Sequence, residues 1–332
     1  MAASADLALI DAHADWGRDA IHAAFRRDVL EGLAQPRKAI PARWFYDDAG
    51  SQLFEDITRL PEYYPTRAET EILAERCHAI GDLVGPGRVV VEFGAGSATK
   101  TPLLLGCIAP AAYVPIDISG EFLRESCAPL AERFPNLPIV PVEGDFTRPF
   151  TVPEIAPGAK PLGFFPGSTI GNLAPAPAAD LLRAMRATLG GEAMLVIGMD
   201  MVKDVHTLLT AYDDPAGVTA AFNRNLLARI NRELGGAIPV EAFAHRAVWN
   251  DALARVEMHL EATRDLAFRI GERTFTMARG ETIHTENSHK YTVRSATMLL
   301  LAGGWNPLEV LYDRDRRFMV IVAEASAGGI SA

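Results

Sequence analysis

The chain has 332 residues, 49% of them hydrophobic and 22% charged, which is enough to bury a sizeable core in one large domain or two smaller ones. A formal net charge of −10 argues against a nucleic-acid partner, because phosphate binding needs a basic face. No apolar run approaches the roughly 18 residues that span a bilayer, and the N-terminal stretch carries acids where a signal peptide has its apolar core, so we expect no membrane association and a cytoplasmic location.

The cysteines fit that location. There are three of them, Cys77, Cys107 and Cys127, with no C-x-x-C spacing, and each lies in an apolar or helical context. In a cytosolic protein such cysteines are reduced core thiols more often than parts of a disulfide framework. We therefore predict free thiols at all three positions.

The first predicted element is a helix over 18–34, where apolar residues repeat at helical spacing. The segment that follows, 35–69, is rich in aromatic residues and Asp, and its prolines break any long helix. It is predicted to be a loop-rich connector. An amphipathic helix is predicted over 69–84, ending at the Gly-Pro-Gly of 85–87.

From about 70 to 200 the chain alternates between short apolar, β-branched runs and helical patterns. The runs predicted as strands cover 88–94, 112–119, 139–146, 162–169 and 192–200. The patterns predicted as helices cover 100–109, 120–134 and 176–189. This alternation is typical of an α/β fold, in which a doubly wound parallel sheet carries helices on both faces.

The pattern changes after residue 200. Two helices are predicted over 203–212 and 217–234, and long alternating runs follow over 254–270 and 273–285. A polar tip between two apolar arms predicts a β-hairpin over 309–325. The C-terminal third is therefore predicted to be an antiparallel α+β structure.

The strongest local motif is "VVVEFGAGSATK" (89–100), in which a predicted strand runs into two glycines and then a helix. Glycines there let the backbone turn tightly and let a ligand approach closely. Thr99 stands where a dinucleotide-binding loop has its third glycine, so the dehydrogenase fingerprint fails. Glu92, Gly94 and Gly96 fit the E-x-G-x-G form of methyltransferases that use S-adenosylmethionine (SAM), although a plain strand-to-helix turn fits them as well.

Acids at the ends of the next two strands favour a nucleotide ligand. Asp117 ends the second strand, where a carboxylate accepts both ribose hydroxyls. Asp145 and Phe146 end the third strand, where an acid and an aromatic ring bond and cover an adenine. The carboxyl ends of the strands are where open α/β sheets bind ligands.

The polar stretch "TENSHKY" (285–291) raises a separate question. On an extended strand, Glu286 and Ser288 share one face. A carboxylate and a hydroxyl suit an imidazole, which presents a donor and an acceptor. From the residues alone, an exposed strand end with local side-chain bonds is the favoured alternative.

Four blocks of the sequence resemble the histidine Nα-methyltransferases of ergothioneine biosynthesis, and the likeness extends over roughly 15–325. The blocks are "WFYDDAGSQLFEDITRLPEYYPTRAETEIL" (44–73), "GDF" (144–146), "GSTIGNLAPAPAADLL" (167–182) and "ENSHKY" (286–291). The resemblance implies a class I methyltransferase with a Rossmann-like, SAM-binding domain over 65–200. It also implies a discontinuous α+β substrate domain, 1–64 together with 201–332, with the substrate held between the two.

The implied reaction is three successive methylations of the α-amine of L-histidine by SAM, giving hercynine, in a monomeric enzyme without a metal. The resemblance implies six cofactor-binding residues: Tyr63, Gly94, Lys100, Asp117, Asp145 and Phe146. The substrate-binding residues that it implies are Tyr46, Asn172, Tyr212, Met258, Glu286 and Ser288. Of these, Tyr46 is the candidate catalytic residue, since it lies near the amine in the family.

Two alternatives stay open at this point. One is a methyltransferase of the same family acting on tryptophan or another aromatic amino acid or amine, against which Glu286 argues because an indole ring has no acceptor nitrogen. The other is a catalytically silent nucleotide-binding subunit. A metal site is not expected, because His284 and His289 are five positions apart with no further ligand clustered beside them in the sequence.

Overall fold

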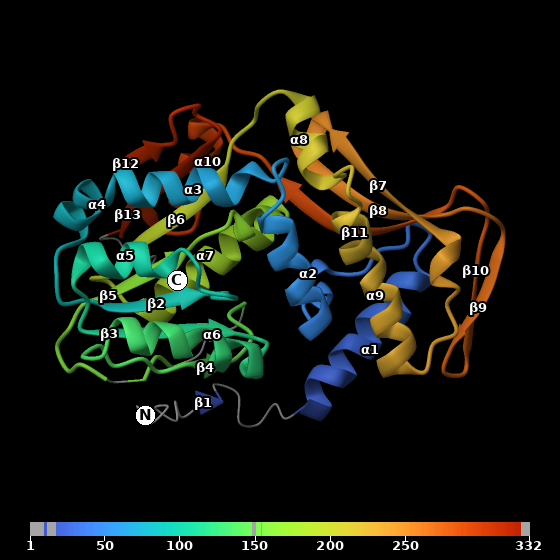
Figure 1. The fold of residues 1–332 in the computed structure, drawn as a ribbon, viewed down its shortest axis with the longest axis horizontal. Helices are drawn as coiled ribbons and strands as arrows, with labels where there is room; N and C mark the ends of the chain where they lie inside the picture. The colour runs from blue at the N-terminus through green and yellow to red at the C-terminus, as the bar shows by residue number, and fades with distance from the viewer. Residues whose placement is uncertain (1–9, 12–17, 148–150, 154, 327–332) are drawn as a thin grey trace. The chain divides into compact units, whose positions relative to one another are not determined.

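A computed structural model of the chain describes residues 10–11, 18–147, 151–153 and 155–326. These residues form two compact units (Figure 1). The first consists of 65–202 and 290–326 together with the short strand β1 (Ile10–Asp11). The second consists of 18–64 and 203–289.

The first unit is built on an eight-stranded sheet in the order β1-β4-β3-β2-β5-β6-β13-β12. The strands from β1 to β6 in that order run parallel, and β13 and β12 are antiparallel additions at one side. The order changes direction between β2 and β5, which is where doubly wound sheets bind ligands at the carboxyl ends of their strands. The bounds are β2 Val89–Phe93, β3 Ala112–Asp117, β4 Val142–Glu143, β5 Pro161–Phe165, β6 Met194–Asp200, β12 Trp305–Tyr312 and β13 Phe318–Ala325.

Helices cover both faces of this sheet because successive strand residues point to opposite sides. In β2, Val90 packs into one cluster with α3, α4, α5 and α6, whereas Val89 and Val91 pack into another with α7 and α10. The expected doubly wound α/β sheet, with helices on both faces, is confirmed. The helices are α3 Tyr64–Glu75, α4 Cys77–Val84, α5 Thr101–Ile108, α6 Gly120–Arg133, α7 Pro175–Leu189 and α10 Val293–Ala302.

The domain boundaries differ from those predicted at both ends of the chain. Residues 290–326 belong to the first unit, where β13 pairs antiparallel with β6 and is buried along most of its length. Lys290 and Asp200 form a buried ion pair of 2.8 Å where the chain re-enters this unit. At the other end, β1 pairs with β4. The hairpin β12–β13 was visible in the sequence, but nothing local indicated which sheet it joins.

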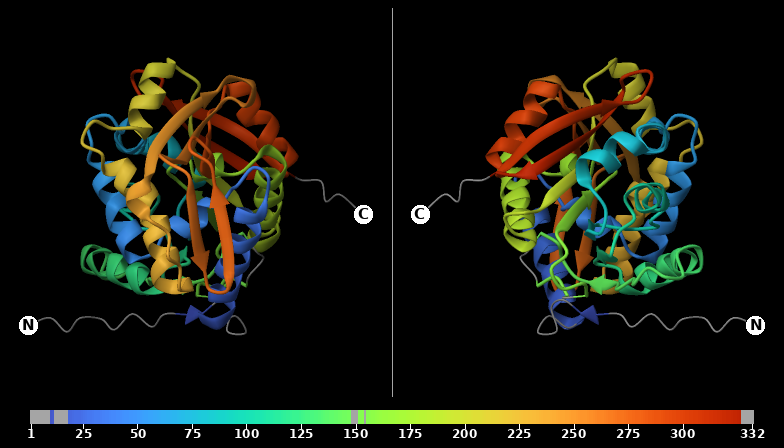
Figure 2. Two further views of the ribbon diagram at one scale, coloured as in Figure 1. Left: turned by 90° about the vertical axis from the view of Figure 1, so that its right-hand side faces the viewer. Right: turned by 90° about the vertical axis from the view of Figure 1, so that its left-hand side faces the viewer.

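The second unit contains a three-stranded antiparallel sheet, in the order β11-β8-β7, and the separate hairpin β9–β10, seen in orange in the left view of Figure 2. Helix α9 packs leucines and an isoleucine against this unit's core. The helices are α1 Arg18–Ala34, α2 Asp48–Thr58, α8 Val205–Tyr212 and α9 Val218–Leu234. The strands are β7 Phe243–Asn250, β8 Arg255–Ala262, β9 Leu266–Ile270, β10 Arg273–Met277 and β11 Thr282–His289.

The segment predicted as a loop-rich connector contains helix α2. Asp47 caps this helix, since its Oδ1 accepts the backbone N–H of Gly50 at 2.8 Å. The aromatic residues of the segment form part of the core: Phe45 and Phe54 both contact Phe222 of α9. The prolines therefore bound the helix rather than prevent it.

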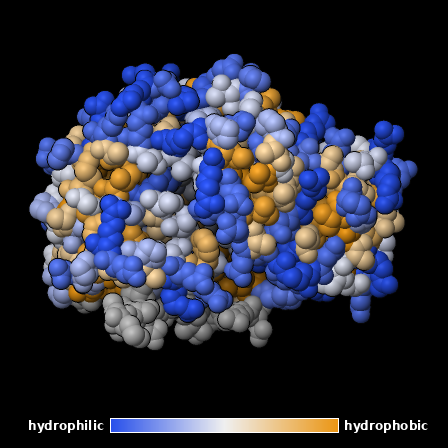
Figure 3. Space-filling model, in the orientation of Figure 1, coloured by the Kyte–Doolittle hydropathy of each residue, from blue (hydrophilic) through white to orange (hydrophobic). Residues whose placement is uncertain are grey.

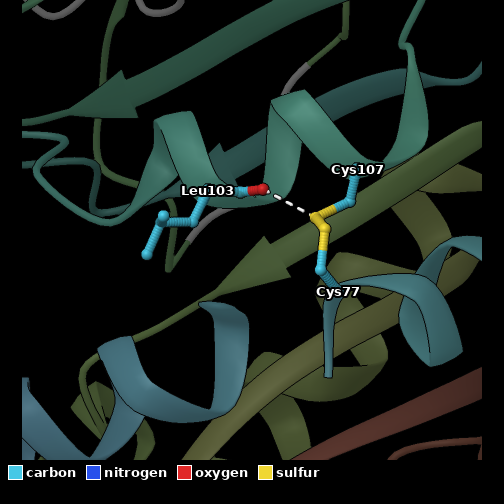
Figure 4. The surroundings of a disulfide bond; sticks show 3 residues. All are labelled: Cys77, Leu103 and Cys107. Carbon is cyan, nitrogen blue, oxygen red and sulfur yellow. Dashed lines mark hydrogen bonds between the residues drawn. A yellow bond between two sulfur atoms is a disulfide. The ribbon is translucent and has the colours of Figure 1, made fainter. Parts of the chain in front are cut away.

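The prediction of three free thiols was wrong for two of them. Cys77 at the start of α4 and Cys107 near the end of α5 form a disulfide, with their Cα atoms 5.5 Å apart (Figure 4). The two helices pack side by side, a contact that sequence spacing does not reveal. Cys127 is a buried free thiol, and burial raises its pKa to about 12.

Hydrophobic and hydrophilic residues are interspersed on the face shown in Figure 3. Among the described residues, no helix combines the length and the apolar character needed to cross a membrane.

Candidate functional site

The glycine loop lies where strand β2 ends in the first unit. Gly94 has a φ of +72°, and a Cβ added to it would meet the ring of Phe146 at 3.2 Å. A side chain at position 94 would therefore be strained by the backbone conformation and would crowd this ring. Phe146 is fixed in turn by edge contacts with Phe93 and Phe165. Two residues predicted for the cofactor thus lie in contact.

Asp117 joins the same cluster from the end of β3. Its two carboxylate oxygens accept backbone N–H groups, one from Gly96 and one from Ser119, each at 3.0 Å. Burial raises the pKa of Asp117, and these backbone hydrogen bonds oppose the shift. Each oxygen keeps a further lone pair, so the carboxylate can hold the loop and still accept two hydroxyl donors.

Asp145 stands just beyond β4, and its Oδ1 accepts the backbone N–H of Thr147 at 3.0 Å and the hydroxyl of Thr147 at 2.5 Å. This local turn sets the direction of the segment that carries Phe146. The pair therefore lies at the carboxyl ends of the strands, as predicted.

Lys100 immediately precedes α5, and its Nζ pairs with Glu69 of α3. Glu69 is 1% exposed, and its Oε2 also accepts the backbone N–H of Gly167 at 2.8 Å. A buried carboxylate thus fixes both the lysine and the turn after β5. An ammonium group has three donors, so Lys100 can also pair with a second carboxylate. Glu69 was not predicted as part of the site, since nothing local in the sequence marks it as a partner of residues 31 and 98 positions away.

Glu92 has a structural function, unlike the neighbouring residues that are predicted to bind the cofactor. It is 1% exposed, and its Oε2 accepts the hydroxyls of Tyr113 at 2.6 Å and Thr101 at 2.7 Å. Burial raises its pKa to about 7. Glu92, the acid of the E-x-G-x-G pattern, therefore links β2 to β3 and to the first turn of α5. These links stabilise the two elements between which the glycine loop runs.

The raised pKa of Glu92 predicts a pH dependence of stability. Between pH 4.5 and about 7 the folded protein binds more protons at this site than the unfolded chain, so the free energy of unfolding falls as pH rises through that window. Glu92→Gln should remove this slope, because its amide does not ionise between pH 4.5 and 7. Denaturant unfolding at pH 5, 6, 7 and 8 measures this, and parallel curves for the two proteins would contradict it.

Asn172 lies in the first unit, unlike the other residues predicted for the substrate. It ends a short 3-10 helix, Thr169–Asn172, that follows β5. The preceding Ser168 has a φ of +60°, and its Oγ accepts the backbone N–H of Asp200 at 2.9 Å. This bond ties the segment to the end of β6, so Asn172 is positioned by the sheet that carries the glycine loop.

The second unit brings four of the predicted substrate residues together. Glu286 pairs with Met258 and Ser288 pairs with Val256 across β11 and β8, so these side chains share one face, as the i, i+2 spacing predicted. The hydroxyl groups of Ser288 and Tyr212 are 2.6 Å apart. Tyr212, Met258 and Ser288 are buried, and Glu286 is partly exposed. The stretch 285–291 is therefore a largely buried, hydrogen-bonded segment rather than a solvated strand end.

Two further tyrosines lie in this unit. The ring of Tyr46 contacts Phe54 and Phe222, and the ring of Tyr63 makes an edge contact with Tyr212 at 6.3 Å between centroids. Tyr63 thus neighbours a residue predicted for the amino acid. Its predicted function in cofactor binding stays a prediction.

Comparison with known proteins identifies the family of the chain. A family described as histidine-specific, SAM-dependent methyltransferases matches residues 25–325. The chain belongs to this family. The resemblance seen in the sequence is thereby confirmed, as is a SAM-dependent methyltransferase as the class of enzyme. The residue assignments within the site stay predictions.

Three relatives show the range of similarity among proteins that resemble this chain. A histidine N-alpha-methyltransferase of Mycobacterium tuberculosis (strain CDC 1551 / Oshkosh) is 42% identical over 87% of this chain and 91% of its own length. Ergothioneine biosynthesis protein 1 of Schizosaccharomyces pombe is 26% identical over 80% of this chain and 36% of its own length. A 4-dimethylallyltryptophan N-methyltransferase of Epichloe festucae var. lolii is 23% identical over 83% of this chain and 88% of its own length.

In the methyltransferase, the face of β8 and β11 that lies opposite Glu286 and Ser288 carries a cluster of possible metal ligands that the sequence did not indicate. Glu257, His259 and His284 place potential ligand atoms within 4.8 Å of one another, and the two histidine rings stack. However, Oε1 of Glu257 already accepts donors from Arg255 and Asn250, and the pKa of this carboxyl is lowered to about 2. The cluster is thus satisfied in large part by hydrogen bonds within the unit.

We expect methyl transfer to be independent of this cluster. Activity should persist in EDTA, because displacement at a sulfonium needs no Lewis acid and the cluster lies on the opposite face of the sheet from Glu286 and Ser288. Initial rates before and after dialysis against the chelator measure this. Loss of activity in EDTA with recovery on adding one specific divalent ion would overturn the expectation.

Proposed function

We propose that the enzyme transfers three methyl groups in succession from SAM to the α-amine of L-histidine, giving hercynine, as a step of ergothioneine biosynthesis. The observation that carries this proposal is the placement of Glu286 on the same face of β11 as the hydrogen-bonded pair of Ser288 and Tyr212. The names of the bacterial and fungal relatives support the same substrate and pathway.

The chemistry of the cluster fits an imidazole. A neutral imidazole has one N–H donor and one acceptor nitrogen. A carboxylate at Glu286 accepts the N–H, and the hydroxyl of Ser288 donates to the other nitrogen. The Ser288 hydroxyl, which lies 2.6 Å from that of Tyr212, can turn its one proton to that nitrogen, so Tyr212 keeps its own proton for the carboxylate of the amino acid. We assign the carboxylate of the amino acid to Asn172 and Tyr212, and a wall of the pocket to the buried Met258.

The cofactor is assigned to the loop of the first unit. Asp117 accepts hydrogen bonds from the ribose hydroxyls. Asp145 forms a hydrogen bond with the adenine, and the ring of Phe146 covers it. Gly94 lets the ligand approach the backbone closely. Lys100, held by the buried Glu69, pairs with the methionyl carboxylate. Tyr63 completes the set as the resemblance implies. When bound, SAM supplies a methyl group already activated by its positive sulfur.

The protein's main task is then orientation and proton removal. The nitrogen must carry a lone pair in order to form the N–C bond while the C–S bond breaks, and an α-amine with a pKa of about 8 or higher is largely protonated at neutral pH. We assign Tyr46 to the removal of that proton, through water to solvent. After the third transfer the nitrogen has no lone pair, so the series ends chemically.

The product spectrum tests the proposal. Mass spectrometry after incubation with SAM and each of histidine, tryptophan and tyrosine should show mono-, di- and trimethylated histidine and little product from the other two. The relative named for 4-dimethylallyltryptophan makes tryptophan the main alternative, and preferential methylation of tryptophan would replace histidine as the assigned substrate. We further infer a monomer in the cytoplasm, which light scattering on the purified protein and fractionation of cells test.

A further inference from the structure

Strand β11 has an irregularity at the point where the predicted substrate residues begin. His284 pairs with His259, and Glu286 pairs with the next residue of β8, Met258, so Thr285 is an extra residue in the ladder. Ile283 pairs with Leu260, which places Ile283 and Glu286 on the same face although they are three positions apart. A β-bulge re-aims the side chains that follow it.

The bulge decides which side chains of β11 lie on the same face of the sheet as Met258. In a regular strand, the residues on the face of Ile283 would be 285 and 287, and Glu286 and Ser288 would lie on the other face, with His284. The bulge reverses that alternation from residue 286 onward. Glu286 and Ser288 reach the face of Met258 only because Thr285 is bulged.

The bulge is held by a buried side chain of another element. The hydroxyl of Thr285 lies 2.8 Å from Oδ1 of Asn223 and 3.0 Å from the carbonyl oxygen of Met258, both of them acceptors for its proton. Asn223, on α9, is fully buried, and its Nδ2 donates to the carbonyl oxygen of His259 at 3.1 Å. Asn223 therefore holds both the bulged residue and the strand opposite it.

The same asparagine is linked to Tyr212. Its Nδ2 lies 2.9 Å from Nδ1 of His245, which must accept, and Nε2 of His245 then donates to the carbonyl oxygen of Tyr212 at 2.8 Å. These contacts fix the tautomer of a histidine whose side chain is 2% exposed. Burial lowers the pKa of His245, which keeps it neutral.

These bonds form a closed ring. Starting at the Tyr212 carbonyl it passes through His245, Asn223 and Thr285, follows β11 to Ser288, and returns to Tyr212 through the pair of hydroxyls. The ring joins α8, α9, β7 and β11. Every member is buried or nearly so, and a buried network of this kind is rigid when each of its groups is satisfied.

We propose that Thr285, Asn223 and His245 are positioning residues that set the selectivity for an imidazole, because they hold the bulge that turns Glu286 and Ser288 onto the substrate face. This inference rests on the proposed function. It assigns no contact with substrate to these three residues, which act through Glu286, Ser288 and Tyr212.

Thr285→Val tests the proposal with a change of almost no volume. Valine cannot donate, so Asn223 and the Met258 carbonyl lose the proton that they share, and the bulge loses its tie to α9. The KM for histidine should rise by about 10- to 100-fold, the scale of losing the hydrogen bonds that Glu286 and Ser288 make with the imidazole. The dissociation constant for S-adenosylhomocysteine should stay within about twofold, since five of the six residues assigned to the cofactor lie in the first unit. Thr285→Ser, which keeps the hydroxyl, should restore the KM.

Thr282→Val is the matched control. It makes the same change in the same strand, but Thr282 pairs with Glu261 on the opposite face, and its KM for histidine should equal that of the wild type. A folded T285V protein with a wild-type KM for histidine would overturn the proposal, and so would an equal loss in T285V and T285S.

A second variant keeps the test decisive if T285V does not fold. In His245→Gln the amide N–H can still reach the Tyr212 carbonyl, but no acceptor faces Asn223. The KM for histidine should again rise while binding of S-adenosylhomocysteine is retained, and an unchanged KM would refute the ring. A wild-type enzyme that does not methylate histidine would instead refute the proposed function.

Discussion

Glu286→Ala is expected to lose most of its efficiency on histidine and to gain relative activity on tryptophan. Removing the carboxylate leaves the imidazole N–H without its acceptor in a partly closed site, at a cost of about 1–3 kcal/mol in binding, and more if the ring is cationic. An indole needs no acceptor opposite its carbon edge, and the shorter side chain leaves more room for it. The ratio of kcat/KM for histidine to that for tryptophan should therefore fall by about 10- to 100-fold.

Kinetics with both substrates at saturating SAM measure this ratio. Ser288→Ala should lower turnover of histidine with a smaller change in the ratio, because the serine contacts only one nitrogen. Asn287→Ala is the matched control, since Asn287 pairs with Glu257 on the opposite face of the strand. If E286A keeps wild-type efficiency on histidine, the assignment of this face to the imidazole fails.

Asp117→Ala is expected to weaken SAM binding by about 1.5–3 kcal/mol, the scale of hydrogen bonds to a charged group. The carboxylate both receives the ribose hydroxyls and holds the backbone N–H groups of Gly96 and Ser119. Its removal therefore loosens the loop as well as removing an acceptor. Asp117→Asn, which keeps an oxygen for one of these donors, should lose less.

Calorimetric titration with S-adenosylhomocysteine measures the effect, and circular dichroism checks the fold. Asp180→Ala provides a control in the same unit, because the Asp180 side chain is 72% exposed and forms an ion pair with Arg183 on the surface of α7. An unchanged dissociation constant in a folded D117A protein would exclude the ribose assignment.

Short-range patterns in the sequence were enough to predict the cofactor unit's central strands and its loop. Strand β2, the two glycines and Asp117 are each marked by residues that are close in the chain, and parallel strands bring their ends to one edge. Glu69 was missed because its partners, Lys100 and Gly167, are close to it only in space. The disulfide between Cys77 and Cys107 was missed for the same reason.

The substrate face shows a different limit of sequence patterns. The i, i+2 rule placed Glu286 and Ser288 together, which the strand pairing bears out. It could not indicate which face they share, because that depends on one extra residue at Thr285. The signal for the bulge is a threonine whose partner, Asn223, lies on a helix 62 positions earlier.

The return of the C-terminal segment to the first unit has a consequence for biosynthesis. Strand β6 leaves the ribosome more than a hundred residues before β13, which pairs with it from Asp200 to Met194. At about 5–20 residues per second, this side of β6 waits on the order of ten seconds for its partner, while the chain of the second unit is still being made. Unpaired strand edges of this kind are where nascent chains associate with one another. Messages truncated near codon 289 should therefore give an aggregating product, although they encode every residue of the second unit and the whole glycine loop.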